Sequence, residues 1–157
     1  MTALPSLLND LGNPKLRDSM VEASLLAGLA ISQTRTSLCH SISYPMTAHF
    51  GIPHGLACAF TMPAVLRYNL GFDDGRFERL AKVLPFNRAG KLETLIDHFD
   101  QLNQKLNVAK KVRESVGSFE MLTALCEEMI TPGRADNALN KVSSKDVLSV
   151  LECSWGF

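Results

Sequence analysis

Residues 37–55 of the chain, SLCHSISYPMTAHFGIPHG, contain the features that decide the fold. The first part of this stretch can form a helix. Pro45 lacks a backbone N–H and its ring clashes with the preceding turn, so we predict a kink or break there. Residues 51–53 form a predicted turn, and His54 opens an apolar segment that continues to about Asn69. Because this segment is apolar on most faces, we expect it to be a buried central helix.

Helical periodicity continues on both sides of this centre. Asn13 precedes Pro14, and apolar residues then recur every three or four positions, so we predict an N-cap followed by a helix of about 20 residues. No segment alternates strictly enough to require a strand. We therefore predict an all-α fold, an irregular helical bundle around residues 56–66. The remaining predicted helices lie at 73–84, at 91–106, after Ser118 as far as Pro132, and from Ser143 or Ser144 onward.

Length and composition limit the class of protein. A chain of 157 residues predicts a single helical domain, residues 1–157. Its 16 basic and 16 acidic residues balance, which gives no charge excess for nucleic acid or an anionic membrane. The longest apolar run, residues 23–31, is shorter than the roughly 20 residues that span a bilayer. The N-terminus also lacks the basic region of a signal peptide. We therefore predict a cytoplasmic protein without nucleic-acid or membrane partners.

Two histidines are the candidate metal ligands, whereas the cysteines are expected to be core residues. His40 and His54 are fourteen residues apart, and imidazoles at a helix kink and at a helix N-terminus can converge on divalent iron or zinc. The four cysteines contain no C-x-x-C pair and lie mostly in apolar helical patterns, which favours reduced core thiols over ligands. They are Cys39, Cys58, Cys126 and Cys153.

Residues 37–55, together with MPAVLRYN at 62–69, resemble the C-terminal signature of the iron-containing alcohol dehydrogenases. The resemblance covers nearly the whole chain. It implies that His40 and His54 occupy the positions of two of the family's four metal ligands. The other two, an Asp and a His, lie further upstream than this chain extends, so the resemblance implies half a metal site.

The resemblance also implies an activity and its requirements. In the family the metal acts as a Lewis acid on an alcohol or aldehyde while a hydride moves to or from a nicotinamide. An N-terminal domain with a glycine-rich loop holds that cofactor, and no such unit occurs in this sequence. We therefore expect a truncated oxidoreductase domain that is inactive alone, does not bind NAD(P), and binds Fe or Zn weakly or between subunits. The alternative is a non-catalytic helical module that associates with itself or with a partner chain.

Tyr44 is a candidate residue near the substrate. It stands where many members of the family have a third histidine, and with Thr47 it resembles the branch that acts on phosphonate aldehydes. The alternative is that Tyr44 is a phenol on the helix surface in contact with Pro45.

The resemblance further implies an uncovered apolar surface, because the helical domain of the family packs against the missing N-terminal domain. We place Met46, Phe50, Ile52 and Leu56 on it and expect a homodimer or a partner protein. The alternative is a monomer in which the N-terminal leucines cover this surface.

Overall fold

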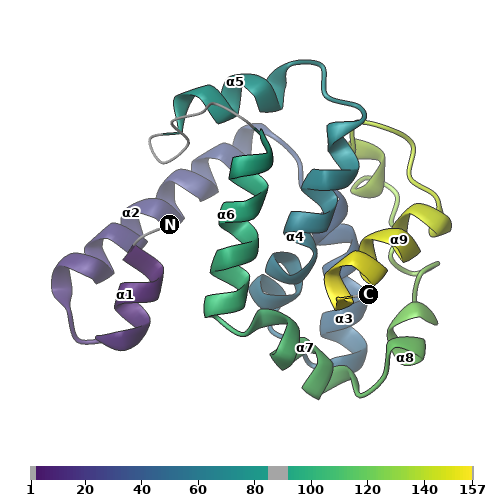
Figure 1. Cartoon of the computed structure of the whole chain (residues 1–157), viewed down its shortest axis with the longest axis horizontal. Coiled ribbons are helices and arrows are strands. Elements are labelled where there is room, and N and C mark those ends of the chain that lie inside the picture. Colours follow the sequence, from purple (N-terminus) through teal and green to yellow (C-terminus); the bar gives the residue numbers. More distant parts are fainter. Residues whose placement is uncertain (1–2, 85–91, 157) are drawn as a thin grey trace. The chain divides into compact units, whose positions relative to one another are not determined.

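The computed structural model describes residues 3–84 and 92–156, and all regular secondary structure in these ranges is helical (Figure 1). The prediction of an all-α fold is confirmed. Backbone contacts divide the chain into two compact units, Met1–Thr36 and Ser37–Phe157, which are described separately below. The single domain 1–157 remains a prediction.

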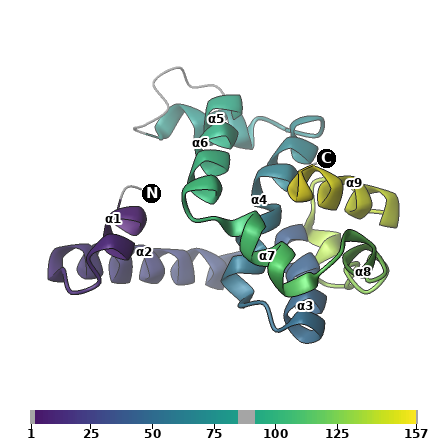
Figure 2. The ribbon, with the colours of Figure 1, turned by 60° about the horizontal axis from the view of Figure 1, so that its bottom comes forward.

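The N-terminal unit is a pair of helices, α1 (Ala3–Asn9) and α2 (Pro14–Gln33), that pack together (Figure 2). The predicted cap is present. The Asn13 side chain accepts a hydrogen bond from the N–H of Leu16 at 3.2 Å, and Pro14 occupies the first helical position, where a missing N–H costs least. The helix therefore begins where the sequence predicts.

The C-terminal unit is built around α4 (His54–Leu70), which contacts α3 (Leu38–Phe50), α6 (Leu92–Lys105), α7 (Val108–Val116) and α9 (Ser144–Trp155) (Figure 1). This arrangement confirms the predicted central helix. The main core of the unit lies between α4 and these neighbours. Its buried side chains include Leu38, Ile42, Met46, Phe60, Val112, Val147 and Leu151.

Helix α3 continues from Leu38 to Phe50 through Pro45, so the predicted break is absent. Proline removes one backbone hydrogen bond and crowds the preceding turn. In this helix Pro45 is buried, and its neighbour Met46 is fully buried in the main core. Because packing of a buried face supplies most of the stability of a helix in a protein, it keeps α3 continuous.

Three shorter elements complete the described chain: α5 (Arg76–Val83), α8 (Phe119–Thr123) and a 3-10 turn, η1 (Ala135–Asn137). The helix predicted after Ser118 is therefore too long. Its apolar residues Leu122 and Met129 are both fully buried, but α8 reaches only the first of them and turns bring the second inward.

The predicted start of a helix at Lys91 lies outside the described residues. Within 3–84 and 92–156, none of the helices combines the length and the apolar character needed to cross a membrane.

The predicted apolar surface is wrong. Met46 and Ile52 are fully buried, and Phe50 and Leu56 are half-buried against the main core. These side chains fill the space between α3 and α4, because the turn at residues 51–53 directs Ile52 inward.

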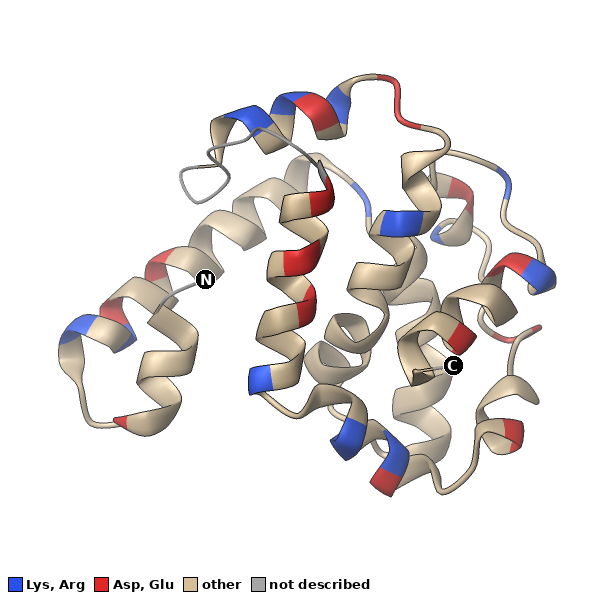
Figure 3. Ribbon diagram, in the orientation of Figure 1, with Lys and Arg blue, Asp and Glu red and all other residues tan. Residues whose placement is uncertain are grey.

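Several of the exposed apolar side chains lie on α2, of which no residue is buried. Val21, Leu25 and Leu29, spaced four residues apart, are 68%, 62% and 56% exposed. The second half of this helix carries no charged residue (Figure 3).

Candidate metal centre

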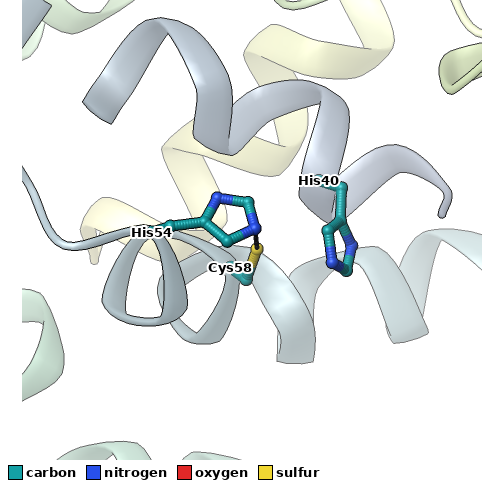
Figure 4. A group of neighbouring side chains, drawn as sticks. All are labelled: His40, His54 and Cys58. Carbon is teal, nitrogen blue, oxygen red and sulfur yellow. Dashed lines mark hydrogen bonds between the residues drawn. The ribbon is translucent and has the colours of Figure 1, made fainter. Parts of the chain in front are cut away.

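The structure brings His40 and His54 together within the C-terminal unit. His40 lies in the first turn of α3 and His54 is the first residue of α4. Their ring centroids are 5.3 Å apart (Figure 4). His40 is half-buried, whereas His54 is exposed at the edge of the site. The two residues predicted as metal ligands are therefore neighbours in space.

A short turn places His54 against the side of α3. Gly51 ends α3 in the left-handed region with φ of 65°, where a side chain would be strained, and its N–H donates to the carbonyl of Thr47 at 3.0 Å. Pro53 then caps α4, and its carbonyl accepts from the N–H groups of Leu56 and Ala57. As a result the His54 ring lies beside residues in the middle of α3.

The contacts of Ser43 assign the proton of the neutral His54 ring to one of its two nitrogens. The Ser43 hydroxyl donates its one hydrogen to the backbone carbonyl of His40 at 2.8 Å, because a carbonyl can only accept. Ser43 Oγ is also 3.1 Å from His54 Nδ1, and in that contact Oγ must be the acceptor. His54 Nδ1 therefore carries a hydrogen, and in the neutral ring Nε2 has the free electron pair.

Cys58 is the residue of this site that the sequence prediction missed. It lies one helical turn after His54, and its Sγ is 3.8 Å from His54 Nε2 (Figure 4). Burial is as predicted, since only 8% of the residue is exposed, and burial raises the pKa of its thiol. The available signal was the spacing His-x-x-x-Cys, which puts both side chains on one face of a helix. One ligand atom each from His40, His54 and Cys58 lie within 4.8 Å of one another.

Arg134 adds a positive charge at the edge of the same site. Its guanidinium carbon lies 4.2 Å from the centre of the Tyr44 ring, a cation–π arrangement, and the Tyr44 ring lies 5.3 Å from that of His54. Burial lowers the pKa of His40, and the charges of His54 and Arg134 lower it further. In the part of the chain that the structure describes, no carboxylate forms an ion pair with Arg134.

The donor set is suited to a transition-metal ion. Two imidazole nitrogens and one thiol sulfur are ligand types that divalent zinc, and less strongly ferrous iron, accept in proteins. His40, His54 and Cys58 can bind such an ion only in their deprotonated forms, and the low pKa of His40 favours its neutral form. The other histidine of α3, His49, is exposed and pairs with Glu128 at 2.8 Å.

The fold and this cluster define a helical domain with a candidate metal site between two of its helices. Residues 1–155 match the family model described as "Fe-containing alcohol dehydrogenase family, C-terminal". The chain therefore belongs to the iron-containing alcohol dehydrogenases and corresponds to their C-terminal domain.

Curated relatives support this assignment. The chain is 34% identical to an alcohol dehydrogenase of Thermococcus barophilus over 131 residues, which are 82% of this chain and 33% of that protein. It is 32% identical to an NADPH-dependent butanol dehydrogenase of Clostridium saccharobutylicum, over 66% of this chain and 27% of the relative. A phosphonoacetaldehyde reductase of Streptomyces viridochromogenes is 40% identical over 67 residues, 43% of this chain and 17% of that protein. The chain thus spans about a third or less of these three relatives.

Proposed function

We propose that this chain is the metal-binding helical domain of an alcohol or aldehyde oxidoreductase and that His40 and His54 are ligands of its metal ion. One observation carries the proposal: the two rings approach to 5.3 Å between centroids in a chain of the iron-containing family. A bound divalent ion with an open position polarises a carbonyl or acidifies a hydroxyl group. The role of this chain is to hold that ion at the ends of α3 and α4.

Tyr44 and Arg134 are the residues that we propose to face the substrate. Tyr44 lies beside His54 and is 39% exposed, and the Arg134 guanidinium lies over the Tyr44 ring. A guanidinium at this place attracts an anionic group. The similarity to a phosphonoacetaldehyde reductase supports an aldehyde that carries a negative charge as the substrate.

Two further requirements limit what the isolated chain does. Two imidazoles leave a divalent ion under-coordinated, so we propose that His40 and His54 alone bind Fe or Zn weakly, or share it with a second subunit. The described residues include no strand, whereas dinucleotide sites of the Rossmann type need a strand, a glycine-rich loop and a helix. We therefore propose that the isolated chain does not bind NAD(P). As a separate proposal, its setting is the cytoplasm.

Calorimetric titration with Zn²⁺ and Fe²⁺ tests the ligand assignment. We expect binding that is lost in His40→Ala and in His54→Ala and retained in His49→Ala, which removes an exposed imidazole paired with Glu128. Binding that survives both substitutions would contradict the assignment.

With NADH or NADPH we expect no turnover of simple aldehydes by the isolated chain. Turnover that His54→Ala abolishes would show that the chain needs no partner.

A second candidate function is that of a non-catalytic module that associates with itself or with a partner chain. The stripe of Val21, Leu25 and Leu29 on α2 favours it, because exposed apolar side chains that adjoin one another mark an interaction surface.

Sedimentation at micromolar concentration tests this alternative with paired variants. Leu25→Asp puts a charge on the stripe and should shift an assembly toward monomer. Ala27→Asp puts the same charge about 160° further round the helix and should have less effect. A monomer at every concentration would exclude self-association through α2 and leave a different chain as the partner.

A further inference from the structure

Cys58 is the described cysteine whose sulfur lies among the donor atoms of the metal centre. Its Sγ and the nearest ring nitrogens of His40 and His54 lie within 4.8 Å of one another (Figure 4). In a tetrahedral zinc site, a sulfur and a nitrogen ligand are about 3.5 Å apart, given Zn–S near 2.3 Å and Zn–N near 2.0 Å. The observed 3.8 Å between Cys58 Sγ and His54 Nε2 differs from that separation by a few tenths of an ångström.

The hydrogen bonds around His54 direct its free electron pair toward this sulfur. Ser43 accepts from His54 Nδ1, so Nε2 is the unprotonated nitrogen, and Nε2 is the atom that contacts Cys58. Without a metal, the thiol of Cys58 is the donor in this contact. Replacing that one proton with a metal ion would make both atoms ligands of the same ion.

We propose that Cys58 is a third ligand of the metal held by His40 and His54, which makes the centre a two-histidine, one-cysteine site that prefers zinc to iron. The inference rests on the proposed function, since it uses the same ion. When the metal–sulfur bond forms, the S–H bond of Cys58 breaks and its proton passes to the solvent. A thiolate is a soft ligand, and soft ligands favour zinc over ferrous iron. Three protein ligands leave one tetrahedral position open, as in catalytic zinc sites.

Cobalt provides the direct test, because Co²⁺ replaces Zn²⁺ and a thiolate bound to Co²⁺ absorbs in the near ultraviolet through charge transfer. The whole chain is titrated with Co²⁺, and Zn²⁺ is then added to displace it. We expect the charge-transfer band in the unmodified chain and in Cys153→Ser, a matched control at an exposed cysteine on α9. We expect no band in Cys58→Ser, and a Zn²⁺ affinity at least about tenfold lower, because loss of an outer-shell partner alone costs that much.

The outcomes separate this inference from the proposed function. If Co²⁺ binds, depends on His40 and His54, and gives no charge-transfer band in the unmodified chain, Cys58 is not a ligand and the proposed function stands. If neither Co²⁺ nor Zn²⁺ binds the unmodified chain, both fail. Absence of the band in the unmodified chain overturns the inference whether or not Cys58→Ser folds, and Cys58→Ala provides a second variant with which to assign a band that is present to Cys58.

Discussion

Replacing Ser43 with alanine removes the hydroxyl group that fixes the orientation of His54. In the folded chain this hydroxyl accepts from His54 Nδ1 at 3.1 Å and donates to the His40 carbonyl at 2.8 Å. Outer-shell partners of metal-binding histidines are typically worth about 10- to 100-fold in metal affinity. His54 is exposed, so water can replace part of the lost interaction, and we expect the low end of that range. The predicted loss in Ser43→Ala is about tenfold in the Zn²⁺ dissociation constant, or about 1.4 kcal/mol.

Calorimetric Zn²⁺ titration measures this loss, and nitrogen NMR of the histidine rings reports its cause. We expect His54 to carry its proton on Nδ1 in the unmodified chain and to show a mixture of both tautomers in Ser43→Ala. Ser154→Ala is the matched control, because it removes a hydroxyl that bonds to the backbone of its own helix, on α9. Equal Zn²⁺ affinity in Ser43→Ala and the unmodified chain would refute the reasoning.

Three further predictions concern stability and titration. Ser41 is fully buried and joins α3 to the backbone of Met129 and Thr131. Ser41→Ala leaves these two backbone groups without a partner, so it should lower the free energy of unfolding in urea by about 2–4 kcal/mol. An equal decrease in Ser115→Ala, which removes an exposed hydroxyl, would contradict this reasoning. Ile52→Asp should abolish the cooperative unfolding transition seen by circular dichroism because it buries a charge, and a folded variant would contradict the core position of Ile52. The pKa of His40 should lie below its ordinary value. Arg134→Leu should raise the pKa of His40, measured by proton NMR, because it removes a positive charge that lowers it. Between the lowered pKa of folded His40 and its unfolded pKa near 6.5, the unfolded state binds more protons than the folded state, so the free energy of unfolding rises with pH. The contribution of His40 to stability is therefore complete above the unfolded pKa. It is lost as the pH falls through the folded pKa.

Local patterns predicted the helices well where a cap and a periodic face agree. Asn13 with Pro14 defines the start of α2, and Ser143 with Asp146 forms the capping box that begins α9. The prediction was wrong where long-range packing decides the outcome. The helix predicted from Ser118 to Pro132 ends at Thr123, and turns carry Met129 into the same core that buries Leu122. Of the kink or break predicted at Pro45, the break is absent.

The site was predictable in part for a similar reason. His40 and His54 could be named because the pattern around them resembles a family signature, and the structure brings them together. Cys58 was interpreted as a core residue, and its burial fits that reading. Its proximity to the histidines depends on the turn at residues 51–53. Arg134 comes from a turn ninety residues along the chain from Tyr44, and no local pattern predicts that contact.

The arrangement of the site separates the tasks of its residues between two helices. Helix α3 supplies His40 and, through Ser43, holds the His54 ring, whereas α4 supplies His54 and Cys58. A change that shifts α3 against α4 therefore alters both the distance between the proposed ligands and the orientation of His54. Ser41 fixes α3 to the segment that precedes Arg134, through a donated bond of 2.5 Å to Met129 and an accepted bond of 3.0 Å from Thr131. The same buried hydroxyl thus connects the position of the proposed metal ligands to that of the guanidinium beside Tyr44.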